Sequence, residues 1–147
     1  MATATSHLID TLNSLLRGEL SATETYQQGL EKVGDEPGVE DVRRIHREHR
    51  AAANELRKLV HAHGGQPDQD SGAWGMFAKT VEGSAKLFGN KAALKALKEG
   101  EEHGVKLYED ALEDGELPGD VASYVRGTLL PQTREHIGVL DRLLESV

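Results

Sequence analysis

The sequence has few aromatic residues. It also has no cysteine and no excess of positive charge, and each of these two absences excludes a class of protein. Without cysteine there are no disulfides and no thiolate metal sites. A formal net charge of −8 argues against binding to nucleic acid or to an anionic membrane surface, because their phosphates would repel the chain. No apolar run reaches the roughly 18 residues that span a bilayer. Residues 1–7 lack the basic and apolar parts of a signal peptide, so we expect a cytoplasmic protein.

What the sequence does contain is helical apolar periodicity. Apolar residues recur at steps of three, four or seven along four long segments, which is the pattern of amphipathic helices. A chain of 147 residues is expected to form one domain, residues 1–147, with a sizeable core. Short turns join the first helix to the second and the third to the fourth, so each pair should be antiparallel. The predicted helices cover residues 6–33, 39–63, 91–114 and 120–146.

The connection between the second and third helices is long and carries a further amphipathic pattern. A short extra helix is expected over Trp74–Phe88, a segment that holds the only tryptophan and both phenylalanines. Asn90 is expected to cap the third helix and Asp120 the fourth. Pro131 falls within the fourth helix and should kink it, because its ring displaces a backbone hydrogen bond.

Two copies of one pattern place a carboxylate inside an apolar stripe. Glu19 and Glu101 each follow a glycine and each precede a tyrosine by seven residues, at Tyr26 and Tyr108. Seven residues are two helical turns, so the glutamate and the tyrosine share one face of the helix. That face is apolar in both copies, and a carboxylate there is costly unless it is paired or binds a metal.

Two histidines occupy matching positions in the other two helices. His49 and His136 lie at the centres of their apolar stripes, within the repeated tripeptide Arg-Glu-His. At about 1.5 Å per residue, His49 lies within about a turn of Glu19 in height, and His136 within about a turn of Glu101. Asn13 is expected on the wet face of the first helix and Gln132 on the inner face of the fourth.

Two glutamates and two histidines at one level of a bundle are a good ligand set for iron, zinc or manganese. We therefore take Glu19, His49, Glu101 and His136 as candidate metal ligands. His46, at the edge of the same stripe as His49, would either add another ligand or simply lie at the boundary between the apolar and the polar face of the helix. Glu48 flanks that stripe and would reach inward after a small rotation. The alternative is a hydrogen-bonded polar layer without metal, with the two tyrosine hydroxyls bonded to the carboxylates.

The stretch Gly18-Glu19-Leu20-Ser21-Ala22, followed by Tyr26, resembles the first-helix motif of bacterioferritins and rubrerythrins. The whole chain resembles a bacterial ferritin-like four-helix-bundle family of uncharacterised function. This resemblance implies an all-α fold, a ferritin-like four-helix bundle with a short extra helix between its second and third helices, and often a homodimer. The stretches that carry it are Glu55-Leu56, Gly64-Gly65-Gln66-Pro67, Gly100-Glu101-Glu102, Tyr108-Glu109-Asp110-Ala111-Leu112 and His136.

The chain departs from the di-iron pattern of these relatives. Such sites use one glutamate from each of two helices and a Glu-x-x-His motif from each of the other two. Glu19 and Glu101 match the single glutamates, but the motifs read His46-x-x-His49 and Thr133-x-x-His136. Both carboxylates of the motifs are missing, so a mononuclear site, an unusual two-metal site and a metal-free site all stay open.

Three functions are consistent with these patterns. The first is a transition-metal-binding bundle with an incomplete di-iron-type site. The second is a metal-free structural or stress-related interaction protein, whose partner would bind the Trp74–Phe88 segment. The third is a metal-dependent oxidase or peroxidase that acts on O₂ or peroxide. The pairing of Glu19 and Glu101 favours this function, and the missing carboxylates count against it.

Overall fold

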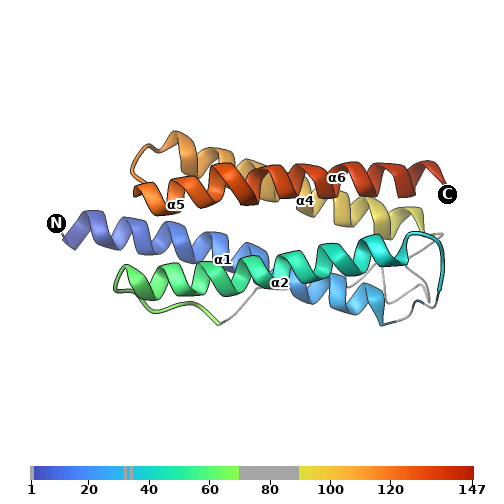
Figure 1. Ribbon diagram of the computed structural model, residues 1–147, viewed down its shortest axis with the longest axis horizontal. Coiled ribbons are helices and arrows are strands. Elements are labelled where there is room, and N and C mark those ends of the chain that lie inside the picture. Colours follow the sequence, from blue (N-terminus) through green and yellow to red (C-terminus); the bar gives the residue numbers. More distant parts are fainter. Residues whose placement is uncertain (1, 32, 34, 70–89) are drawn as a thin grey trace.

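The computed structural model describes residues 2–31, 33, 35–69 and 90–147, and these form a bundle of long helices (Figure 1). One antiparallel pair is formed by α1 and α2, and α4 pairs with the run of α5, η1 and α6. None of the described helices is long and apolar enough to cross a membrane. The elements are α1 (Ala2–Leu30), α2 (Val39–Ala62), α4 (Lys91–Glu113), α5 (Gly119–Tyr124), the π-helical turn η1 (Val125–Leu129) and α6 (Leu130–Glu145).

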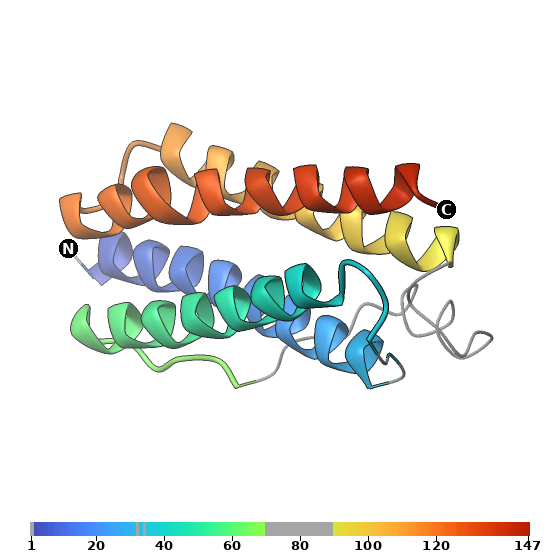
Figure 2. The same ribbon diagram turned by 45° about the vertical axis from the view of Figure 1, so that its right-hand side comes forward.

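The four-helix architecture agrees with the pattern in the sequence, and some boundaries differ. The first helix begins at Ala2 rather than at residue 6, because no glycine or proline interrupts the chain there, and it ends at Leu30 rather than at residue 33. The extra helix expected over Trp74–Phe88 lies outside the described residues. Figure 2 shows the pair of α1 and α2 lying against the pair formed by α4 and the run of α5, η1 and α6, with α1 crossing α2 along its length.

The core is divided into two apolar clusters. One contains the buried residues Leu12, Leu16 and Leu56. The other contains Tyr26, Ile45 and related residues such as Leu97 and Leu140. Buried polar side chains from all four long helices are found in addition, and they include Glu19, His49, Glu101 and His136.

Of the two predicted helix caps, one is confirmed and the other was wrong. Asn90 caps α4, as predicted, and its side chain accepts a hydrogen bond from the Ala93 backbone N–H at 3.1 Å. Asp120 is not the cap of the fourth helix. The helix begins at Gly119, because the Pro118 carbonyl already accepts from the Ala122 N–H at 2.9 Å. The Asp120 carboxylate instead contacts His63 Nε2 at 3.1 Å.

The disturbance expected at Pro131 takes the form of the π-helical turn η1, which ends with a hydrogen bond from the Leu130 N–H to the Val125 carbonyl. A π-helical turn inserts an extra residue and so rotates the following helix about its axis. Thr133 is consequently buried, whereas Gln132, expected on the inner face, is only half-buried.

Asn13 is buried, and the expectation that it lies on the wet face was wrong. Its Nδ2 donates to the Gln66 carbonyl at 3.0 Å, and its Oδ1 accepts from the Asp68 N–H at 2.9 Å. These two bonds hold the segment that follows α2 against α1. The segment that follows α2 thus covers a face of α1 that the apolar periodicity of the sequence assigns to solvent.

Replacing Asn13 by alanine should therefore lower the free energy of unfolding by about 1–2 kcal/mol, because two part-buried hydrogen bonds to the backbone are lost. Urea unfolding of this variant measures the loss. Asn54→Ala is the matched control, since exposed Asn54 only accepts from nearby Arg57, and it should change stability by less than about 0.5 kcal/mol. Equal unfolding midpoints for the two variants would show that the contact is unimportant.

Candidate metal centre

The structure brings four of the predicted site residues together at one level of the bundle. Glu19 comes from α1, His49 from α2, Glu101 from α4 and His136 from α6. All four are almost completely buried, with exposed fractions of 4%, 4%, 2% and 0%. The apolar stripes that carry them form the core, which is why the helices turn these polar side chains inward.

His49 lies between two carboxylates. Its Nδ1 is 2.5 Å from Glu19 Oε2, and its Nε2 is 2.7 Å from Glu101 Oε2. Burial opposes a charge on the ring, but the attraction of Glu101 and Glu19 outweighs burial and raises the pKa of His49 well above its ordinary value. In the absence of a metal, His49 is therefore an imidazolium that donates a hydrogen bond to each carboxylate.

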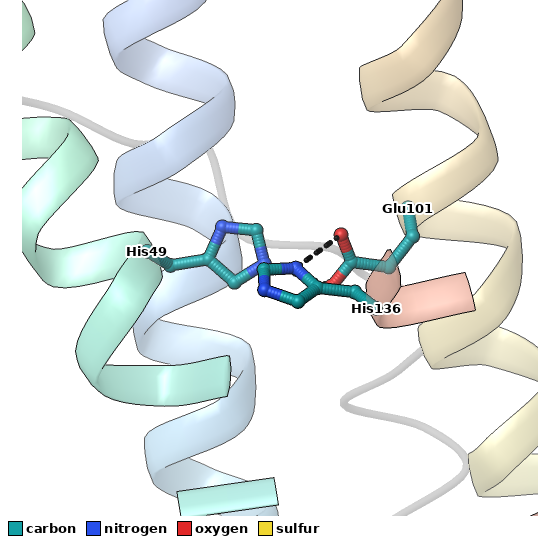
Figure 3. A group of neighbouring side chains, drawn as sticks. All are labelled: His49, Glu101 and His136. Carbon is teal, nitrogen blue, oxygen red and sulfur yellow. Dashed lines mark hydrogen bonds and ion pairs between the residues drawn. The ribbon is translucent and has the colours of Figure 1, made fainter. Parts of the chain in front are cut away.

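Glu101 accepts hydrogen bonds from three side chains. Tyr26 Oη donates at 2.6 Å. His49 Nε2 donates at 2.7 Å, and His136 Nδ1 lies 3.2 Å from the other oxygen (Figure 3). Burial alone would raise the pKa of this carboxyl group. The positive charge of His49 and the hydrogen bond to His136 outweigh burial and lower the pKa of Glu101 to about 2.

His136 connects the buried carboxylate to a second one nearer the surface. Its Nε2 lies 2.7 Å from Glu48 Oε1. Glu48 in turn accepts from Arg44 at 3.1 Å, and Arg44 also binds Glu135 through two bonds of 2.8 and 3.0 Å. Glu48 therefore reaches inward, through its contact with His136 of α6.

The two tyrosines of the repeated motif are hydrogen-bond donors to the glutamates. Tyr26 Oη bonds Glu101, and Tyr108 Oη bonds Glu19. Burial, followed by the charge of the bonded glutamate, raises the pKa of both phenols well above the ordinary value. Both remain neutral donors, and the Tyr26 ring stacks on His49 with ring centroids 5.4 Å apart.

His46 does not join this cluster. It is only half-buried and lines a surface depression with Gln27 of α1 and with Glu31, which follows α1. Its Nε2 is buried without a hydrogen-bond partner among the described residues. Burial, together with the neighbouring positive charges of Arg50, His49 and Arg47, lowers its pKa. Three residues along a helix rotate a side chain by most of a turn, so His46 lies to one side of His49.

The chemistry of the donor set fits a divalent transition metal. Ligand atoms of His49, Glu101 and His136 all lie within 4.8 Å of one another. Both imidazoles turn one nitrogen toward Glu101, and a carboxylate lies against the other nitrogen, Glu19 for His49 and Glu48 for His136. Histidines that bind metals generally hold their second nitrogen in this way, because it fixes the tautomer and the ring orientation.

Two further groups have the composition of a metal site. His7, Asp114 and Glu116 form an exposed cluster, in which His7 Nε2 pairs with Asp114 Oδ2 at 2.7 Å. Glu48, Glu135 and His136 form the other, and Arg44 already neutralises its carboxylates. The carboxylates absent from the sequence motifs have no replacement at Thr133, whose hydroxyl donates to the Leu129 carbonyl at 2.7 Å.

The fold matches two solved ferritin-like structures. One is a protein of Bacillus anthracis strain Ames described as ferritin-like, diiron-carboxylate, with a TM-score of 0.76 and 20% identity over 98% of this chain and 99% of that one. The other is Rhodobacter capsulatus bacterioferritin, solved with a metal-free dinuclear site and haem iron, with a TM-score of 0.70 and 22% identity over 95% and 84% of the chains. At these identities the likeness shows a ferritin-like fold.

Comparison with curated proteins finds no match. A family model, by contrast, covers most of the chain, from the start of α1 to the end of α4, and includes Glu19, His49 and Glu101. That model is described as Domain of unknown function (DUF2383) and matches residues 7–114, so the chain belongs to this family.

Proposed function

We propose that this protein binds one divalent transition-metal ion in the core of the bundle, through His49, Glu101 and His136. The observation that carries the proposal is the orientation of the two imidazoles, each with one nitrogen toward Glu101 and the other held by a different carboxylate. Two histidines and one carboxylate suit Fe(II), Zn(II) or Mn(II).

Glu19 and Glu48 have a supporting role in this proposal. Glu19 holds Nδ1 of His49, and Glu48 holds Nε2 of His136, so neither nitrogen is available to the metal. The nitrogens of His49 and His136 that face Glu101 must both be free of a proton before they can bind a metal, and metal uptake should therefore release protons. A divalent ion would then take over from the imidazolium in neutralising the two buried glutamates.

The proposed site is mononuclear because a second metal would lack ligands. His46 and Thr133 occupy the positions of the two motif carboxylates, and neither reaches the cluster. The similar structures, described as diiron-carboxylate and as having a metal-free dinuclear site, support metal binding by a protein of this fold. When bound, the metal would supply a Lewis acid or, as iron or manganese, a redox centre, which keeps an oxidase or peroxidase among the candidate activities.

Metal content of the purified, untagged protein, grown with iron, zinc and manganese available, tests the proposal. We expect close to one metal ion per chain in the wild type, and loss of that metal in His136→Ala. His46→Ala is the matched control, because it removes an imidazole of α2 that lies outside the cluster. This variant should retain the metal. A folded wild-type protein that stays free of metal after incubation with each ion would overturn the proposal.

The metal-free alternative also has an observation in its favour. The cluster supplies hydrogen bonds to its own buried carboxylates, since His49 bridges Glu19 and Glu101 and each carboxylate accepts from a tyrosine. A polar layer of this kind can fix the register of the helices without any ligand. In that case His136→Ala would lower stability and leave metal content unchanged at zero.

A further inference from the structure

A small cavity borders the cluster on the side where α1 meets α4. Its lining includes Glu19, His49, Glu101 and Thr133, together with Gly18 and Gly104. About 30 Å³ of it is open to a water-sized sphere, which is room for one or two water molecules. A ligand of that size in the cavity would lie against the residues that we propose to hold the metal.

Two of the residues that line the cavity are glycines at positions where neither backbone conformation nor a close contact requires glycine. Gly18 and Gly104 lie inside α1 and α4 and do not have the positive φ that favours glycine. A Cβ at Gly18 would meet Leu107 Cδ1 at 3.6 Å, and one at Gly104 would meet Thr133 Cγ2 at 3.6 Å, which are ordinary contacts. Glycine inside a helix costs about 0.5–1 kcal/mol relative to alanine. What glycine provides here is open space beside the cluster.

On the α6 side of the cavity, Thr133 does not offer a metal ligand. Its hydroxyl donates to the Leu129 carbonyl, and its methyl group is the atom that a Cβ at Gly104 would meet. In the Glu-x-x-His pattern this position carries a carboxylate. A metal held by His49, Glu101 and His136 thus has no protein ligand offered from Thr133, and the space beside it is open.

We infer that this cavity, which we call the α1–α4 cavity, seats an exogenous ligand of the metal no larger than about three atoms. Water, hydroxide, a small linear anion and a diatomic molecule belong to this class, whereas a five-membered ring is too large. The inference rests on the proposed metal site and adds the size and the seat of the ligand. It also assigns a role to Gly104: the space left by its missing side chain sets the size of the ligand that can bind.

Visible absorption of the Co(II)-loaded protein tests the inference without any assay of activity. Azide should change the Co(II) spectrum of the wild type, and imidazole at the same concentration should not. Gly104→Ala should keep Co(II) binding and gain stability but bind azide at least ten-fold more weakly. Gly138→Ala is the matched control, because Gly138 is also inside a helix and its added Cβ would meet only Arg142 at 3.8 Å, so azide binding should be unchanged.

The outcomes separate the two proposals. A wild-type protein that takes up no Co(II) overturns the metal site itself. Uptake of Co(II) with a spectrum that azide leaves unchanged overturns the cavity inference alone, and so does equal azide affinity in the wild type and Gly104→Ala. Gly18→Ala, on the opposite helix, repeats the test if Gly104→Ala does not fold, since it narrows the same cavity.

Discussion

Replacing Glu101 by glutamine is expected to abolish metal binding and to remove several kcal/mol of stability from the metal-free protein. Glu101 accepts from Tyr26, His49 and His136, and its charge balances that of buried His49. Removing one partner of a buried charge pair typically costs about 3–5 kcal/mol, since the other charge remains uncompensated. Co(II) titration measures the metal affinity, and urea unfolding in the presence of a chelator measures the stability.

The same substitution at Glu19 should have a smaller effect on the metal. Glu19 holds the far nitrogen of His49, and loss of such a support usually lowers metal affinity about 10- to 100-fold. Glu102→Gln, on the exposed neighbour of Glu101, is the control and should change neither quantity. If Glu19→Gln and Glu101→Gln abolish binding equally, Glu19 is itself a ligand and our division of the two roles is wrong.

The level of the site in the bundle could be read from the sequence. Helical rise is constant, so counting residues from the turns places Glu19 and Glu101 near the heights of His49 and His136. The apolar stripes identify which side chains face inward, because each stripe must be buried for the bundle to form. These two regularities account for the convergence of the four residues in the structure.

Other features depend on contacts that no local pattern records. The inward position of Glu48 requires His136 from a different helix, and the burial of Asn13 requires the segment that follows α2. Thr133 faces inward in place of the predicted Gln132 because of the π-helical turn before Pro131. The rotation that this turn introduces cannot be obtained from an ideal helical repeat. Tertiary contacts of this kind decide the details of the site.

The charges of the cluster make the metal-free protein sensitive to pH on both sides of neutrality. In acid, Glu101 has a folded-state pKa of about 2 against an ordinary value of 4.5, so its ionised form stabilises the fold. That stability is present above pH 4.5 and is lost as the pH falls toward 2. The difference corresponds to a loss on the order of 3 kcal/mol. The free-energy gap between the wild type and Glu101→Gln should close over this range, as urea unfolding at each pH would show.

In alkali the sign is reversed, because the pKa of His49 is raised in the folded state. Its contribution is complete below the ordinary value of 6.5 and is lost as the pH rises through the raised value. A metal that binds His49 requires the neutral ring, so Zn(II) should abolish this alkaline loss of stability in the wild type. Metal-free His49→Gln should show no alkaline loss, because it has no imidazole at this position. Stability curves measured with chelator and with Zn(II) make the comparison. An alkaline loss that is equally large with Zn(II), or that persists in His49→Gln, would mean that His49 does not carry the charge that the cluster assigns to it.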